Sequence, residues 1–141
     1  MRHAHGVGKV RAAETALMSR LPEGTLMQRA AAGVAAVSAR LLPSVYGSTV
    51  VVLAGSGDNG GDALYAGARL ARRGARVTAV PVGSRVHERA LAALRRAGGR
   101  LPSEETAATD SVLDSVLEDA DLVLDGLIGI GVRGALRDAY A

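Results

Sequence analysis

The stretch VVVLAGSGDNGGDALYAGARLARRGARVTAV, residues 50–80, decides the fold of this chain. A run rich in β-branched residues at 48–54 is too short for a helix and lacks polar alternation, which is typical of a strand buried on both faces of a parallel sheet. The spacing then predicts a helix over residues 62–73 and a second strand over 75–82. Together these segments form a βαβ unit.

The flanking segments extend the same pattern. Helices are expected at 7–20 and 25–42, the second opened by a capping box between Thr25 and Gln28. Further elements are expected after the βαβ unit: a helix at 86–97, a short strand at 100–102, an acidic helix at 109–119 and an apolar strand from Asp121. The prediction is one α/β domain, a Rossmann-like doubly wound, mainly parallel sheet of order 3-2-1-4 with helices on both faces, preceded by two N-terminal helices.

The second predicted helix is rich in small residues. Alanine or glycine occupies most positions of the stretch AAAGVAA, residues 30–36, which permits close approach of another backbone. This helix packs against another helix, against another subunit or against the sheet.

Composition narrows the class of protein. The chain is 48% hydrophobic and 22% charged, as expected of a soluble globular domain. It lacks cysteine, which excludes disulfides and thiolate metal sites and fits a cytoplasmic protein, and it has no apolar run near the roughly 18 residues that a membrane span needs. Acids are spread along the sequence, so we expect no nucleic-acid surface despite a net charge of +3.

A glycine-rich loop follows the first strand. Gly55, Gly57 and Gly60 match G-x-G-x-x-G, in which glycines admit a ligand to the backbone and helix amides attract a phosphate. Neither standard fingerprint is complete, because the second strand ends without an acid for a ribose and no Lys-Ser/Thr pair follows Gly61. Arg85 alone could suggest a 2′-phosphate contact.

Two carboxylates in this loop argue against bare pyrophosphate. Asp58 and Asp62 would repel each other by roughly 1 kcal/mol at about 4 Å in water, and by about 4 kcal/mol at an effective dielectric constant of 20. Either Asp62 is the N-cap of its own helix, or the acids hold ribose hydroxyls, protonate a ring or help to bind a cation.

A second glycine loop follows the last predicted strand, in DLVLDGLIGIGVRG. With order 3-2-1-4 this strand lies beside the first, so both loops emerge at the switch point where ligands bind, and Asn59 could meet Asp125. Such an oxygen-rich pair suits a hard cation, and the amides near Arg133 suit a phosphate. None of the three histidines is assigned chemistry.

Three motifs resemble the YjeF N-terminal domain family, the NAD(P)HX epimerases. The stretch AGSGDNGGDALYAGARLARRGARVTAV is similar to the family's nucleotide loop, DLVLDGLIGIGVRG to its later strand and loop, and RAAETALMSRLPEGTLMQRAA to its opening helices. The resemblance implies an isomerase that interconverts the C6 epimers of hydrated NADH and NADPH, so that a dehydratase can repair the coenzyme. It also implies a homodimer formed through the first helices.

The same resemblance implies site residues. The substrate contacts would be Asp58, Asn59, Gly60, Gly61 and Asp62, with Gly129, Ile130, Gly131, Val132, Arg133, Gly134 and Ala135 around the phosphates. Asn59 and Asp125 would hold a potassium ion. A carboxylate near the ring would be the acid or base, but the pattern does not say which one.

The sequence departs from the family in two respects. Asp58 stands where the family has Asn, and the family's last strands with their V-D-x-P-S-G segment are absent after Ala141. We therefore expect a fragment of a larger protein, whose carboxyl-terminal half could be the dehydratase.

Two other functions compete with the epimerase. Similar domains serve messenger RNA decapping scaffolds as RNA-binding and dimerisation modules, and an NADP oxidoreductase would rest on the glycines and Arg85 alone. The presence of Asn59, Asp62 and Asp125 favours the enzyme.

Overall fold

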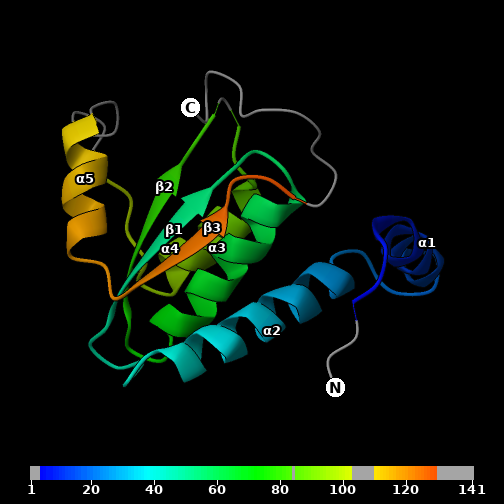
Figure 1. Cartoon of the computed structure of the whole chain (residues 1–141), viewed down its shortest axis with the longest axis horizontal. Helices are drawn as coiled ribbons and strands as arrows, with labels where there is room; N and C mark the ends of the chain where they lie inside the picture. Colours follow the sequence, from blue (N-terminus) through cyan, green and yellow to red (C-terminus); the bar gives the residue numbers. More distant parts are fainter. Residues whose placement is uncertain (1–3, 84, 103–109, 130–141) are drawn as a thin grey trace.

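The computed structural model describes residues 4–83, 85–102 and 110–129. Its elements, in chain order, are α1 (Val7–Met18), α2 (Thr25–Leu41), β1 (Thr49–Ala54), α3 (Asp58–Ala71), β2 (Arg76–Pro81), α4 (Glu88–Arg96), α5 (Asp110–Glu118) and β3 (Leu122–Gly126). Figure 1 shows the strands side by side with α3 behind them and α2 crossing below. The predicted α/β class is confirmed.

The sheet is parallel, with the order β2-β1-β3. On the outer side of β2, a single parallel bridge joins Thr78 to Arg100, at the place of the predicted short strand. The predicted order is therefore confirmed, although that segment forms a bridge rather than a full strand. At the start of β3, the Asp121 amide donates to the Thr49 carbonyl over 2.9 Å, and the Thr49 amide donates to the Asp121 carboxylate over 2.8 Å.

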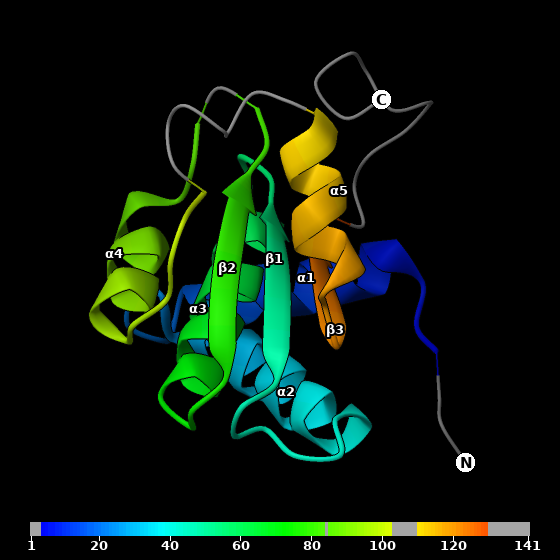
Figure 2. The same cartoon turned by 90° about the vertical axis from the view of Figure 1, so that its left-hand side faces the viewer.

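Helices cover both faces of the sheet, as predicted. Figure 2 shows α5 in front of the strands, with α2, α3 and α4 behind them. The core lies between β1 and α3, where Val50, Val52 and Leu64 are fully buried. Burying each such side chain stabilises the fold by roughly 1.5–3 kcal/mol. A Cβ at Gly67 would come within 2.9 Å of Val52, so this glycine lets α3 lie close to the sheet.

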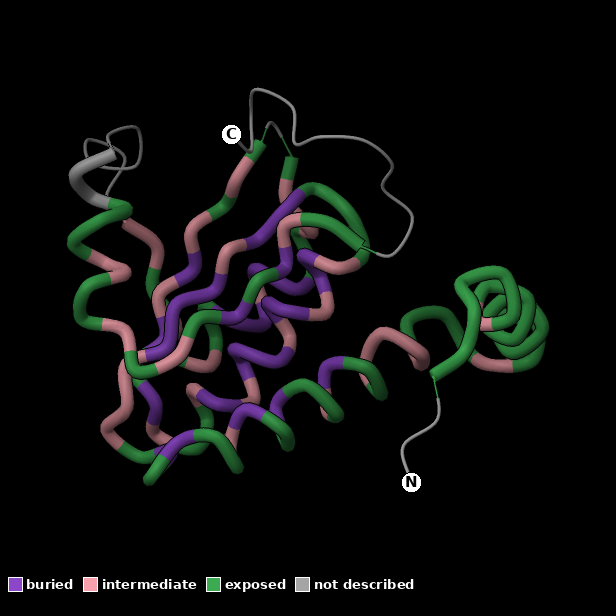
Figure 3. The backbone as a smooth tube through the Cα atoms, viewed as in Figure 1, coloured by how far each residue is buried: buried purple, intermediate pink, exposed green. Residues whose placement is uncertain are grey.

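The small residues of α2 pack against α3 rather than directly on the sheet. Ala31, Ala35 and Ser38 form its buried side, while Val34 and Val37 are exposed on the outer side. Figure 3 shows this division along α2, and shows α1 as almost entirely exposed. Of the expected partners, another helix is confirmed, and it is α3.

The N-terminus of three helices differs from the prediction, in the capping residue of α2 and in the first residue of α3 and α4. The N-cap of α2 is Gly24, at φ 79°, without a side-chain hydrogen bond, so the expected capping box does not form. Helix α3 begins at Asp58, which places Asp62 in its second turn and rules it out as the N-cap. Helix α4 begins at Glu88, capped by His87.

The early start of α3 has a packing cause. Gly60 and Gly61 are buried within the helix, where they allow other groups to touch its backbone. Their low helix propensity makes the same residues look like a loop in the sequence. In the described part of the chain, no helix is long and apolar enough to cross a membrane.

Candidate functional site

The two glycine loops meet at the carboxyl edge of the sheet. The Gly55 amide donates to the Gly126 carbonyl over 3.1 Å. A Cβ at Gly55 would collide with the carbonyl oxygen of Leu127, and one at Gly60 would collide with the carbonyl oxygen of Gly55. Close backbone contact therefore requires glycine at both positions, and the predicted meeting of the loops at the switch point is confirmed.

Asn59 faces the loop after β3. Its side-chain amide donates to the Ile128 carbonyl over 2.9 Å, and a Cβ at Gly129 would lie 3.7 Å from the Cβ of Asn59. Because the nitrogen is used in this bond, the amide oxygen is the atom left to bind a ligand.

Asp125 lies on the other side of β3. Leu124 and Gly126 are buried, whereas Asp125 between them is exposed, because alternate residues of a strand face opposite ways. One carboxylate oxygen accepts from the Leu127 amide over 3.0 Å. Among the described residues, no hydrogen bond joins Asp125 to Asn59.

The chemistry of these two groups fits a hard cation. Each keeps an oxygen, and oxygen is the donor that such ions prefer. In the described ranges, no three histidine or acidic side chains are placed so as to hold a metal ion, so the pair would need further oxygen donors. The expected phosphate contacts at 130–135 lie outside the described residues.

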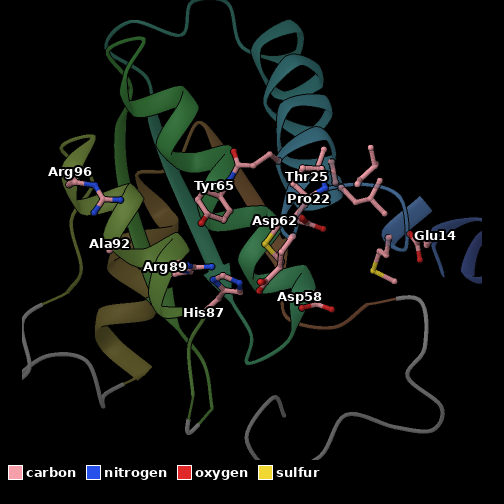
Figure 4. Close-up of a pocket in the computed structure, with 18 residues that line it drawn as sticks. Glu14, Pro22, Thr25, Asp58, Asp62, Tyr65, His87, Arg89, Ala92 and Arg96 are labelled. Carbon is pink, nitrogen blue, oxygen red and sulfur yellow. The ribbon is translucent and has the colours of Figure 1, made fainter. Parts of the chain in front are cut away.

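Asp58 and Asp62 lie apart from this edge, on the wall of a pocket of about 1130 Å³. The pocket is enclosed by α1, the turn into α2, and the first turns of α3 and α4. Figure 4 shows Asp62 and His87 side by side in it, with Tyr65 and Arg89 on one side and Glu14 across the opening. The structure therefore divides the predicted substrate loop: Asn59 faces β3, and the acids face the pocket.

Asp62 has the most unusual environment in this pocket. One of its carboxylate oxygens is buried and has no hydrogen-bond partner among the residues that the structure describes. Burial raises the pKa of Asp62 to about 6, helped by the nearby charges of Asp58 and Glu14 and opposed by His87. A carboxyl group of this kind holds and releases a proton close to neutral pH.

His87 is a pocket residue that the sequence analysis missed. Its Nδ1 accepts a hydrogen bond from the Ala90 amide over 3.2 Å, which caps α4. Its ring lies edge-on to Tyr65, with centroids 6.0 Å apart. A Cβ at Gly61 would lie 2.9 Å from the ring, so glycine there lets the histidine close over α3. The available signal was its place directly before an acidic first helical turn.

Comparisons with known proteins agree with this arrangement. The family model described as YjeF-related protein N-terminus matches residues 23–141. The bifunctional NAD(P)H-hydrate repair enzyme Nnr of Mycobacterium leprae is 47% identical, over all of this chain and 28% of its own length. The NAD(P)H-hydrate epimerase of Microbacterium testaceum is 43% identical, over 95% of this chain and 51% of its own length.

A solved structure supports the fold alone. A crystal structure of a yeast protein superposes with a TM-score of 0.71 and 22% identity, covering 84% of this chain and 52% of the yeast chain. This chain thus spans between about a quarter and a half of the length of these proteins.

Proposed function

Because the chain belongs to the family of YjeF-related protein N-termini, we propose that it forms the epimerase part of an enzyme that interconverts the R and S forms of hydrated NADH and NADPH. Relatives over 40% identical carry the names NAD(P)H-hydrate epimerase and NAD(P)H-hydrate repair enzyme. The proposal rests on the close contact between the Gly55 loop and the Leu127 backbone. This contact brings the two glycine loops together at the carboxyl edge of the sheet, where a ligand would bind, although the chain has neither standard dinucleotide fingerprint.

The substrate's phosphates would lie at this edge. The amides in the first turn of α3 lie at the positive end of the helix dipole, and residues 129–135 would add further amides and the Arg133 guanidinium. Asn59 and Asp125 would hold a potassium ion through their oxygens. When bound, potassium supplies positive charge that offsets the phosphates and the nearby acids.

The expected partners follow from the family. The bifunctional relatives support a dehydratase on the same polypeptide, which would consume the epimer produced here. The exposed outer side of α2 supports a homodimer formed through the first helices. No nucleic-acid or membrane partner is proposed.

The test is the rate at which purified (R)-NADPHX becomes the S form, with potassium or sodium present. We expect the full-length protein to exceed the spontaneous rate, and Asp125→Ala to lower the potassium-dependent rate tenfold or more, in line with losses at perturbed metal sites. Asp114→Ala, an exposed acid on α5, is the matched control and should change nothing. If the protein does not raise the spontaneous rate of epimerisation and binds RNA saturably, the chain is a binding module and not an epimerase.

A further inference from the structure

The pocket beside α3 fits an uncharged ring better than a phosphate. Its wall carries Asp58 and Asp62, which would repel an anion, together with the rings of Tyr65 and His87 and the apolar side chain of Met27. A hydrated nicotinamide ring is neutral and flat over much of its area. At about 1130 Å³, the pocket has room for this ring and its ribose while the phosphates remain at the sheet edge.

On this basis, which rests on the proposed function, we propose that Asp62 is the catalytic acid and base that exchanges the hydroxyl group at C6 of the hydrated nicotinamide ring. The residue lies in the pocket wall one helical turn beyond Asp58, on the side of α3 that faces α1 and α4.

The other titratable groups of the pocket are less suited to this role. They are Glu14 from α1, Glu23 from the turn before α2, Asp58 and Tyr65 from α3, and His87, Arg89 and Arg96 from α4 and its N-cap. Glu14, Glu23 and Asp58 are exposed to solvent. The Nδ1 of His87 accepts a hydrogen bond from the Ala90 amide, so this nitrogen is not available to the substrate.

The environment of Asp62 matches the step. A buried oxygen without a partner disfavours the charged form, so the carboxyl group retains a proton nearer neutral pH than an exposed acid does. His87 can donate from Nε2 to the carboxylate once the proton has left. We therefore assign His87 a positioning role.

The C6 hydroxyl group is exchanged in two steps, loss of water and addition of water. The carboxylic acid of Asp62 gives its proton to the C6 hydroxyl, the C6–O bond breaks with its electron pair remaining on oxygen, and water leaves. The lone pair of the ring nitrogen forms the C=N bond of an iminium ion. Water then adds to C6 from the opposite face and releases its proton to solvent, which yields the other epimer, and the Asp62 carboxylate takes up a proton from solvent. In the reverse direction Asp62 is the base that accepts the proton of the water adding on its own face.

The test measures epimerisation by the full-length enzyme between pH 5 and 8. We expect kcat/KM of the wild type to fall as pH rises through about 6, because the protonated carboxyl group starts the reaction. Asp62→Asn should lower kcat by about 10²–10⁴, the usual worth of general acid–base catalysis, with KM changed less than threefold and the pH dependence lost. Asp114→Asn, at an exposed acid of α5 that does not line the pocket, is the control and should retain the wild-type pH profile.

A second variant separates chemistry from folding. Asp62→Ala leaves space for a small carboxylic acid, so formate should restore at least a tenth of the lost rate, which it would not do for a defect in folding. If the wild type is active but Asp62→Asn matches it in rate and pH profile, or formate has no effect on Asp62→Ala, the assignment is wrong. An inactive wild type would instead overturn the proposed function on which the assignment rests.

Discussion

Ionisation of Asp62 opposes folding. The pKa of its carboxyl group is about 6 in the folded protein, against an ordinary value of 3.8, because burial and the neighbouring acids disfavour the charge. Protonated Asp62 therefore contributes stability that is complete below about pH 3.8 and lost as pH rises through 6. At neutral pH the fold carries this cost in order to keep an ionisable group in the pocket.

We predict that Asp62→Asn is more thermostable than the wild type at pH 7.5, by about 1 kcal/mol after allowance for solvent screening of a partly exposed group. The gain should shrink towards pH 5, where the wild-type carboxyl group is already protonated. Thermal melts at the two pH values measure it, with Asp114→Asn on α5 as the exposed control. A gain of equal size at both pH values would show that the charge of Asp62 is not the cause.

Single residues also show which contacts could not be predicted from the sequence. It identified the glycine loop, but it could not tell that Gly55 and Gly60 are required by close contacts while Gly57 has open space around it. The atoms that crowd Gly55 belong to Leu127, from a distant part of the chain. Likewise, His87 has no motif around it, and only the approach of α4 to Gly61 brings its ring into the pocket.

Among the elements, the strands and most helix starts were predicted to within a residue, and the largest error is the start of α3. β1 and β2 lie within a residue of their expected bounds, because both are short runs rich in β-branched residues. Helix starts depend on single backbone conformations, such as the positive φ of Gly24, and on packing that tolerates glycine within α3. Propensity alone does not contain that information.

The packing of α2 on α3 leads to a second prediction. Ala35→Leu should lower the free energy of unfolding by about 1–3 kcal/mol, because the larger side chain overfills a buried contact. Ala36→Leu, on the exposed side of the same turn, should change it by less than about 0.5 kcal/mol. Urea denaturation measures both, and equal effects would mean that α2 does not pack through this side.

For the whole molecule, topology was predictable and the pocket was not. Right-handed crossovers leave few ways to order alternating strands and helices, so the order β2-β1-β3 followed from the pattern. The pocket is lined by residues of α1, α2, α3 and α4. How these four helices pack against one another is not encoded in any short stretch of sequence. The grouping of Asp58, Asn59 and Asp62 in one substrate site stays a prediction, with the two acids in the pocket wall and Asn59 bonded to Ile128.

The proposed homodimer gives a prediction at this scale. Val34, Val37 and Leu41 are 38%, 48% and 69% exposed along the outer side of α2, an apolar stripe that a partner copy would cover. Val37→Glu should shift the protein from dimer to monomer in analytical ultracentrifugation, because it would bury a charge. Arg40→Glu, at an exposed polar position of α2, is the control. A wild type that is monomeric at all concentrations would contradict the proposal.

The paired hydrogen bonds between Thr49 and Asp121 imply an order of assembly. They join positions 72 residues apart, whereas β1, α3 and β2 follow one another directly along the chain. Closing so long a loop costs on the order of 4 kcal/mol of chain entropy, so β3 should join a unit that has already formed. Since Leu127 and Ile128 follow β3, the ligand edge would be the last part of the molecule to form and the first to be lost when it opens.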